Sequence, residues 1–402
     1  MTPEPLSKIP GGMRYYFGAE ARLRRALEAK CMSVFDGWSY EEIATPSVDY
    51  YALFERGMGH DEAHRAFRFT DTDGRLLALR PDVTSSVARA AATLFAERTR
   101  PLRLCYAASV FRQRARSHAE WRRESKHLGC ELVGAGSHEA DIEMLVIVAE
   151  ALEKLGLRGE CRITLNHVEI FNGVAEHLSL DQDAREEMRL LVDTRDDAGL
   201  RDFLATRAAS SSQLDAFSSR LPRLTGGREV LTEARRMITN GRSLAALDAL
   251  ETLWETIEAL KLSDLFEIDL GDTSGLDYYT GLVFKIYVVG AGTRVGSGGR
   301  YDELTANFGR REPAVGFVLD LDALTDVLAR NESCFLSLDD GYISSIGGVD
   351  ATRLFKEAMR RRANDERVRV GLEMKRHSME SSDEVEAPSD ETATRRDREV
   401  AE

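Results

Sequence analysis

A long stretch without strand signals, residues 180–262, separates the strand-like runs of this chain into two groups. Leu, Ala, Arg and Glu recur in it at helical spacing, and Gly226-Gly227 interrupts them. Before this stretch strand-like and helical runs alternate, and strand-like runs resume after it. Antiparallel strands interrupted by helices are typical of an α+β fold. The sequence therefore predicts an α+β protein with a largely antiparallel sheet and a helical insertion at 180–262.

The elements predicted outside the insertion follow from apolar periodicity and from turn residues. Residues 65–80 form a predicted hairpin, because Asp73-Gly74 supplies a tight turn between two strand-like runs. The glycine-rich run "GAGTRVGSGGRYDEL" is predicted to be a turn. The other predicted elements are helices at 13–36, 84–96 and 138–156, strands at 101–112, 265–270 and 278–289, and a strand passing into a helix at 314–324.

The apolar pattern weakens after about residue 335, which suggests a large domain followed by smaller parts. We expect a core domain at 1–328 that includes the helical insertion, and a small C-terminal extension at 329–374. Residues 375–402 are polar and charged without apolar periodicity, so a disordered acidic tail is predicted there.

Composition narrows the classes of function. The net charge of −14 argues against non-specific affinity for phosphate backbones, so no nucleic-acid partner is expected. The five cysteines include no CxxC pair, and neither a metal site nor a cofactor is predicted. The first residues contain no apolar signal core, and no segment approaches the ~20 apolar residues of a membrane span. We therefore expect a soluble, cytoplasmic protein without a membrane partner.

Polar side chains concentrate on four segments that end or interrupt strand-like runs: "LRPDVT", "SVFRQRARSHAEWRR", "KHLGCE" and "LDYYTG". An amino-acid pocket needs such a set, because carboxylates bind the α-ammonium and tyrosines supply both an apolar wall and hydrogen bonds. Glu131 and Asp82 could bind an ammonium group, and Tyr278 or Tyr279 could face a ring. The four segments also offer Arg80, Thr84, Arg112, His127, Asp277 and Thr280.

Each of these residues also has a purely structural interpretation, which the pattern alone leaves open. Glu131 and Asp82 could be a helix cap and an internal ion pair. The tyrosine pair could pack against the two faces of a sheet, since neighbouring side chains on a strand alternate. Arg112 could be structural. The run "GSGGRYDEL" lacks the lysine and spacing of a P-loop, and a hairpin or close packing accounts for it better.

Six motifs occur in order along the chain: "LRPDVT", "SVFRQ", "LGCELVG", "GLDYYTG", "GGRYDEL" and "PAVGF". Through these motifs, residues 11–328 resemble the class II histidyl-tRNA synthetase core. The resemblance implies a six-stranded antiparallel sheet with flanking helices, a helical insertion before the tyrosine motif, and a homodimer. It also implies a histidine pocket. On the matching positions its lining residues would be Asp82, Thr84, Arg112, His127, Glu131, Tyr278 and Tyr279.

Departures from the synthetase pattern affect the chemistry. Adenylation builds negative charge on the α-phosphate, and fixed cations must stabilise it. The synthetase pattern has arginine where this chain has Ser274 and Ala323. It has a third in the loop at Trp121, although Arg122 and Arg123 are adjacent and a one-residue shift would restore that one. The chain after Leu328 is also too short for the anticodon-binding domain.

With these departures the chain resembles the synthetase-like regulatory subunits of ATP phosphoribosyltransferase. An aspartate is expected in those subunits at the position of Asp82. His127 departs from both the synthetase pattern and the regulatory-subunit pattern. The resemblance implies no catalytic residues, a short-form catalytic subunit as partner, a hetero-octamer that contains the homodimer, and histidine as feedback effector. Two alternatives stay open: a diverged synthetase-like aminoacyl ligase, and a free-standing sensor protein.

Overall fold

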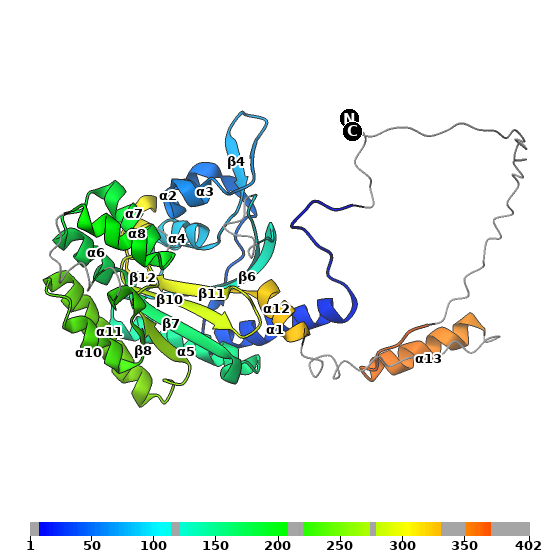
Figure 1. Ribbon diagram of the computed structural model, residues 1–402. Coiled ribbons are helices and arrows are strands. Elements are labelled where there is room, and N and C mark those ends of the chain that lie inside the picture. The colour runs from blue at the N-terminus through cyan, green and yellow to red at the C-terminus, as the bar shows by residue number, and fades with distance from the viewer. Residues whose placement is uncertain are drawn as a thin grey trace, which may run out of the picture. The chain divides into compact units, whose positions relative to one another are not determined.

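The computed structural model describes residues 8–113, 121–207, 217, 220–273, 279–330 and 350–370, except for the side chain of residue 61. The chain divides into two compact units, residues 1–337 and 338–402. In the second unit the described residues contain one helix, α13 (Ala351–Ala363). The site and the fold that positions it belong to the first unit (Figure 1).

A nine-stranded mixed sheet forms the centre of the first unit, in the order β1-β5-β6-β12-β11-β10-β7-β9-β8. The six strands from β5 to β7 are antiparallel throughout, as the resemblance implied. Short strands extend this sheet at both edges, and β1 and β9 join it in parallel. The strands are β1 (Glu41–Glu42), β5 (Leu102–Phe111), β6 (Glu124–Val133), β7 (Cys161–His167), β8 (Thr225–Gly226), β9 (Phe266–Asp269), β10 (Leu282–Val288), β11 (Arg294–Arg300) and β12 (Ala314–Asp320).

One face of the sheet carries the main hydrophobic core. Helix α1 buries Leu23, Leu27, Val34 and Phe35 there, which is the apolar face that the sequence periodicity indicated. In Figure 1, α5 and α11 lie below the sheet on this side. The helices that contribute to this core are α1 (Gly18–Gly37), α5 (His138–Lys154), α6 (Val168–His177), α7 (Gln182–Asp193), α8 (Asp197–Ala205), α10 (Arg228–Arg235), α11 (Gly241–Ala259) and α12 (Leu321–Ala329).

The opposite face is covered by a smaller layer. Val87 and Ala91 of α4, with Val83 just before the helix, form one buried cluster with the apolar side chains of β5. A three-stranded sheet of order β2-β4-β3 packs against α2, and α2, α3 and α4 appear above the large sheet in Figure 1. These elements are α2 (Tyr51–Met58), α3 (His60–Ala63), α4 (Thr84–Ala92), β2 (Val48–Tyr50), β3 (Arg68–Thr70) and β4 (Leu76–Leu79).

The predicted hairpin at 65–80 is confirmed, because β3 and β4 pair antiparallel and Gly74 takes a positive φ of 79° in the turn. The predicted helix at 13–36 begins later, at Gly18. Phe17 is extended and Gly18 has a positive φ, so the chain before them cannot continue the helix. Among the described helices none is long and apolar enough to cross a membrane.

The glycine-rich run is only partly a turn. Residues 289–293 connect two strands, but Arg294–Arg300 forms β11 in the middle of the sheet, paired with β10 and β12. The prediction of a turn over the whole run is therefore wrong. Close packing, the structural alternative raised for "GSGGRYDEL", describes this strand better.

Candidate functional site

A cavity of about 170 Å³ lies on the face of the sheet that α2 and α4 cover. Residues from widely separated segments line it. Six of the seven predicted site residues are among them, and Tyr278 lies outside the described residues, as do Ser274 and Asp277. The six are Asp82, Thr84, Arg112, His127, Glu131 and Tyr279.

Strand register explains why these side chains meet. His127 and Glu131 are four residues apart on β6, so their side chains point to the same face and are separated by roughly 13 Å along the strand. On the neighbouring strand β12, Gly316 stands opposite Glu131 and Asp320 opposite His127. The cavity therefore has one end near Glu131 and another near Asp320.

Glycines keep the floor of the cavity open. A Cβ on Gly316 would overlap the Glu131 carboxylate oxygen Oε2, and a Cβ on Gly299 would lie 2.8 Å from the ring of Tyr279. Two glycines on adjacent strands, β12 and β11, thus let a carboxylate and an aromatic ring lie directly on the sheet. This close approach is the physical reason for a strand as rich in glycine as β11.

Glu131 is almost fully buried, with 1% of its surface exposed, and hydroxyl groups surround it. Oε1 accepts hydrogen bonds from Thr84 Oγ1 (2.7 Å) and Tyr106 Oη (3.2 Å), and Oε2 accepts one from the hydroxyl of Tyr301. Burial raises the pKa of Glu131 to about 7, against the opposing effect of the three hydroxyl donors. It forms no ion pair with any described residue, so the internal ion pair considered for it is absent there.

Asp82 is a second buried carboxyl beside Glu131. Its Oδ2 accepts a hydrogen bond from the hydroxyl of Ser85 in the first turn of α4 (3.1 Å), while Oδ1 has no hydrogen-bond partner in the described part of the chain. Burial raises its pKa to about 6, although Ser85 and Arg112 oppose the shift. Asp82 thus contacts the helix start, as the cap interpretation suggested, and still leaves one oxygen available for a ligand.

His127 is buried near the other end. Burial lowers its pKa well below the usual value, and the positive charges of Arg112, Arg294 and Arg80 add to this effect. The ring is neutral at pH 7 and can donate one hydrogen bond and accept another. Burial raises the pKa of Asp320 to about 6, as it does that of Asp82, and in both carboxyls the charge of Arg112 opposes the shift, so this charge acts on both ends of the cavity.

Several lining residues were missing from the sequence prediction. Tyr106 and Tyr301 hold Glu131, and Lys285 forms an ion pair with Asp272. A lysine inside the apolar run "LVFKIYV" was the one local signal for that pair. Arg294 also lines the cavity. Arg80 and Thr280, named among the candidates, instead make hydrogen bonds to backbone groups.

The structure shows which residue of the arginine loop reaches the cavity. Trp121 is 50% exposed, whereas Arg122 lines the cavity, so an arginine is present after a one-residue shift. Ala323 lines the cavity as well and brings no charge there. The synthetase-type arginines are thus reduced rather than lost together.

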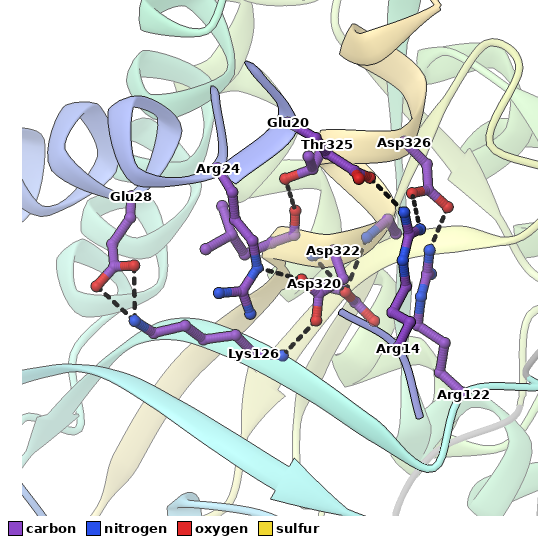
Figure 2. Close-up of polar contacts among 12 residues, drawn as sticks. Arg14, Glu20, Arg24, Glu28, Arg122, Lys126, Asp320, Asp322, Thr325 and Asp326 are labelled. Atoms are coloured by element: carbon purple, nitrogen blue, oxygen red, sulfur yellow. Dashed lines mark hydrogen bonds and ion pairs between the residues drawn. The ribbon is translucent and has the colours of Figure 1, made fainter. Parts of the chain in front are cut away.

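Arg122 is not isolated in the cavity wall. Its guanidinium forms an ion pair with Asp326 of α12, which also accepts a hydrogen bond from Arg14 (3.3 Å) (Figure 2). Asp322 of the same helix accepts hydrogen bonds from Arg24 Nε (2.5 Å) and from the backbone N–H of Lys126 (2.8 Å). Asp322 and Asp326 of α12 therefore bind three arginines that lie far from this helix in the sequence.

Comparison with known proteins shows which protein family is similar to this chain. The histidyl-tRNA synthetase family model matches residues 12–324. An ATP phosphoribosyltransferase regulatory subunit of Moorella thermoacetica is 37% identical over 87% of this chain and 88% of its own length. One of Geobacter sulfurreducens is 37% identical over 82% of this chain and 75% of its own.

The chain belongs to the family of ATP phosphoribosyltransferase regulatory subunits. A solved structure described as an ATP phosphoribosyltransferase regulatory subunit/histidyl-tRNA synthetase from Bacillus halodurans superposes with a TM-score of 0.81. It is 27% identical and covers 92% of this chain and 93% of its own. Histidyl-tRNA synthetase from a Nostoc species, at 20% identity and a TM-score of 0.75, shows the shared fold alone. This family's members are regulatory subunits, and the present chain is a non-catalytic subunit of that class.

Proposed function

We propose that this chain assembles with a short-form ATP phosphoribosyltransferase catalytic subunit and makes that subunit's activity sensitive to histidine. In this proposal the chain acts in the cytoplasm as a homodimer within a hetero-octamer. Histidine binds in the cavity on β6, β11 and β12 as the feedback effector of histidine biosynthesis. The four cysteines described as unpaired thiols, Cys31, Cys105, Cys130 and Cys161, suit a reducing compartment.

The observation that carries the proposal is the pair of buried carboxyls, Asp82 and Glu131. Buried polar atoms in proteins are nearly always hydrogen-bonded, so the unpartnered Oδ1 of Asp82 in a cavity wall indicates a donor that arrives with a ligand. An α-ammonium group brings three N–H donors and a positive charge. It would satisfy Asp82 and stabilise the ionised form of Glu131.

The other predicted residues receive roles that follow from their chemistry. Thr84 orients the Glu131 carboxylate through its hydroxyl group. Tyr279 and Tyr278 would form the aromatic wall for an imidazole. Arg112 would attract the ligand carboxylate, and neutral His127 would donate or accept one hydrogen bond at the rim.

Feedback inhibition adds a thermodynamic condition. Histidine shifts an equilibrium between active and inhibited assemblies only if it binds the inhibited assembly more tightly. A retained pocket without the full set of adenylating arginines can bind the amino acid and leave it unchanged, which suits such a sensor.

The test combines binding with activity. Histidine is titrated into the purified chain by calorimetry, and the chain is then mixed with a short-form catalytic subunit and assayed with and without histidine. We expect saturable binding, activity that depends on the chain, and inhibition by histidine. The same measurements are made on Asp82→Asn, which removes a carboxyl of the cavity. Its matched control is Asp248→Asn, which changes the charge at an exposed ion pair of α11. A chain that neither activates the catalytic subunit nor makes it sensitive to histidine would contradict the proposal.

A second candidate is a diverged aminoacyl ligase, which the four arginines lining the cavity favour: Arg65, Arg112, Arg122 and Arg294. It requires histidine-dependent exchange of pyrophosphate into ATP. We expect no exchange above background, because Ala323 supplies no charge and Arg122 is paired with Asp326. Measurable exchange would support this candidate over the first.

A further inference from the structure

Helix α12 and its cap carry three carboxylates near the end of the cavity at His127, and one of them, Asp320, lines the cavity. Asp320 caps the helix, Asp322 is in its first turn, and Asp326 is one turn further on. Together with Arg122 we call them the ion-paired cluster. Figure 2 shows these side chains converging with Arg14 and Arg24 from the N-terminal part of the chain. The cluster therefore joins the cavity wall to α1.

Asp326 engages Arg122, one of the arginines that line the cavity. The Arg122 side chain is 14% exposed and forms its ion pair with Asp326 Oδ2. Arg14 contacts the same Asp326 carboxylate and also forms an ion pair with Glu20 (2.6 Å). Nε of Arg122 has no hydrogen-bond partner among the described residues, so an incoming anion would compete with Asp326 for the charge of Arg122 rather than for every donor of its guanidinium.

Asp320 occupies the second group that would attract an anion. The N-terminus of a helix binds phosphate through its free backbone N–H groups. In α12 the Asp320 side chain accepts hydrogen bonds from two of them, Asp322 N and Ala323 N, both at 2.9 Å. Asp320 also lines the cavity, so its carboxyl group stands where a phosphoryl oxygen would otherwise meet these amides.

We propose that Asp320 and Asp326 determine the specificity of this end of the cavity: they engage Arg122 and the N-terminus of α12, so that the cavity accepts a free amino acid and rejects phosphorylated ligands. The amino-acid part rests on the proposed function, whereas the exclusion of phosphate does not. A phosphoryl group carries close to two negative charges and would meet the like charge of Asp320. An amino-acid carboxylate carries one charge and can use Arg112 further along the cavity.

The test measures the binding of inorganic pyrophosphate to the full-length chain by calorimetry. Asp326→Asn removes the charge that holds Arg122, and Asp320→Asn removes a charge while an asparagine still caps the helix. Glu20→Gln is the matched control, because it removes one carboxylate from the same network and does not contact Arg122. Histidine titrations run in parallel on the wild type.

We expect each Asp→Asn variant to bind pyrophosphate about tenfold more tightly than the wild type, and the double variant more tightly still. Glu20→Gln should match the wild type. Adding Arg122→Gln to Asp326→Asn should abolish the gain, which separates the cavity from surface arginines. If Asp326→Asn fails to fold, Asp320→Asn decides the matter, since it leaves the Arg122 pair intact.

The inference is overturned if the folded Asp→Asn variants bind pyrophosphate no more tightly than Glu20→Gln does. It is also overturned if the wild type already binds pyrophosphate as tightly as those variants. The outcome is independent of the sensor role. Histidine binding by the wild type without a gain in pyrophosphate binding would leave the proposed function standing and reject this inference. The reverse result would keep the inference and reject the proposed histidine site.

Discussion

The two ends of the cavity treat buried charge in opposite ways. Asp82 and Glu131, the carboxyl pair, are surrounded by hydroxyl donors and form no ion pair with a described residue. In the ion-paired cluster each carboxylate of α12 is held by backbone N–H groups or by arginines of the same chain. The difference teaches that one end leaves negative charge for a ligand to neutralise, while the other neutralises its own charges internally.

Removing an acid from the ion-paired cluster should lower stability strongly. Asp322 is 1% exposed, and its loss in Asp322→Ala leaves Arg24 and the backbone N–H of Lys126 without their carboxylate. We expect the free energy of unfolding to fall by about 3 kcal/mol, as when one partner of a buried pair is removed. Chemical denaturation measures it. Asp248→Ala, at an exposed pair, is the control, and an equal loss in both variants would contradict the assignment.

Removing an acid from the carboxyl pair should have the opposite effect on stability and a large effect on binding. Asp82→Asn takes away a carboxyl whose ionisation is harder in the folded than in the unfolded chain, since burial raises its pKa to about 6, so stability at pH 7 should rise. Histidine should bind roughly 10- to 100-fold more weakly, because a hydrogen bond to a charged group is worth about 1.5–3 kcal/mol. Denaturation and calorimetry on the same sample give both quantities. A variant that loses stability and keeps its affinity would show that Asp82 is structural.

The same carboxyl pair predicts a pH dependence of binding. Because burial raises the pKa of Glu131 to about 7 and that of Asp82 to about 6, both are partly protonated below neutral pH. Their contribution to stability is complete below pH 4 and is lost as the pH rises through 6 and 7. An ammonium ligand needs the ionised forms, so its affinity should rise about tenfold between pH 5 and 8, with release of protons on binding.

Calorimetry in buffers with different ionisation enthalpies measures the released protons. Glu131→Gln separates the protein from the ligand, whose own imidazole titrates near pH 6.5. The variant should lose the proton release that belongs to Glu131 and retain the parts that belong to Asp82 and to the ligand. Identical proton release in the variant and the wild type would remove Glu131 from the linkage.

Much of this contrast could be read from the sequence, and the missing parts share a physical cause. Strand β5 and helix α5 follow from local apolar periodicity, and the carboxyl pair lies on segments that the sequence analysis singled out. Strand β11 was missed because glycines carry no strand preference, and its pairing partners on β10 and β12 hold it in the sheet. The Arg122–Asp326 pair joins residues 204 positions apart, which no local pattern reveals.

The smallest expected effect lies at the outer edge of the ion-paired cluster. Glu20 lies in the first turn of α1 and forms an ion pair with Arg14, which precedes the helix. The Glu20 and Arg14 side chains are partly exposed, at 23% and 32%. Glu20→Gln should therefore lower the free energy of unfolding by less than about 1 kcal/mol, and the loss should shrink at high salt. Denaturation at two salt concentrations measures it. A loss comparable to that of Asp322→Ala would mean that Arg14 and Asp326 depend on Glu20, and the boundary between the cluster and the surface would have to be drawn further out.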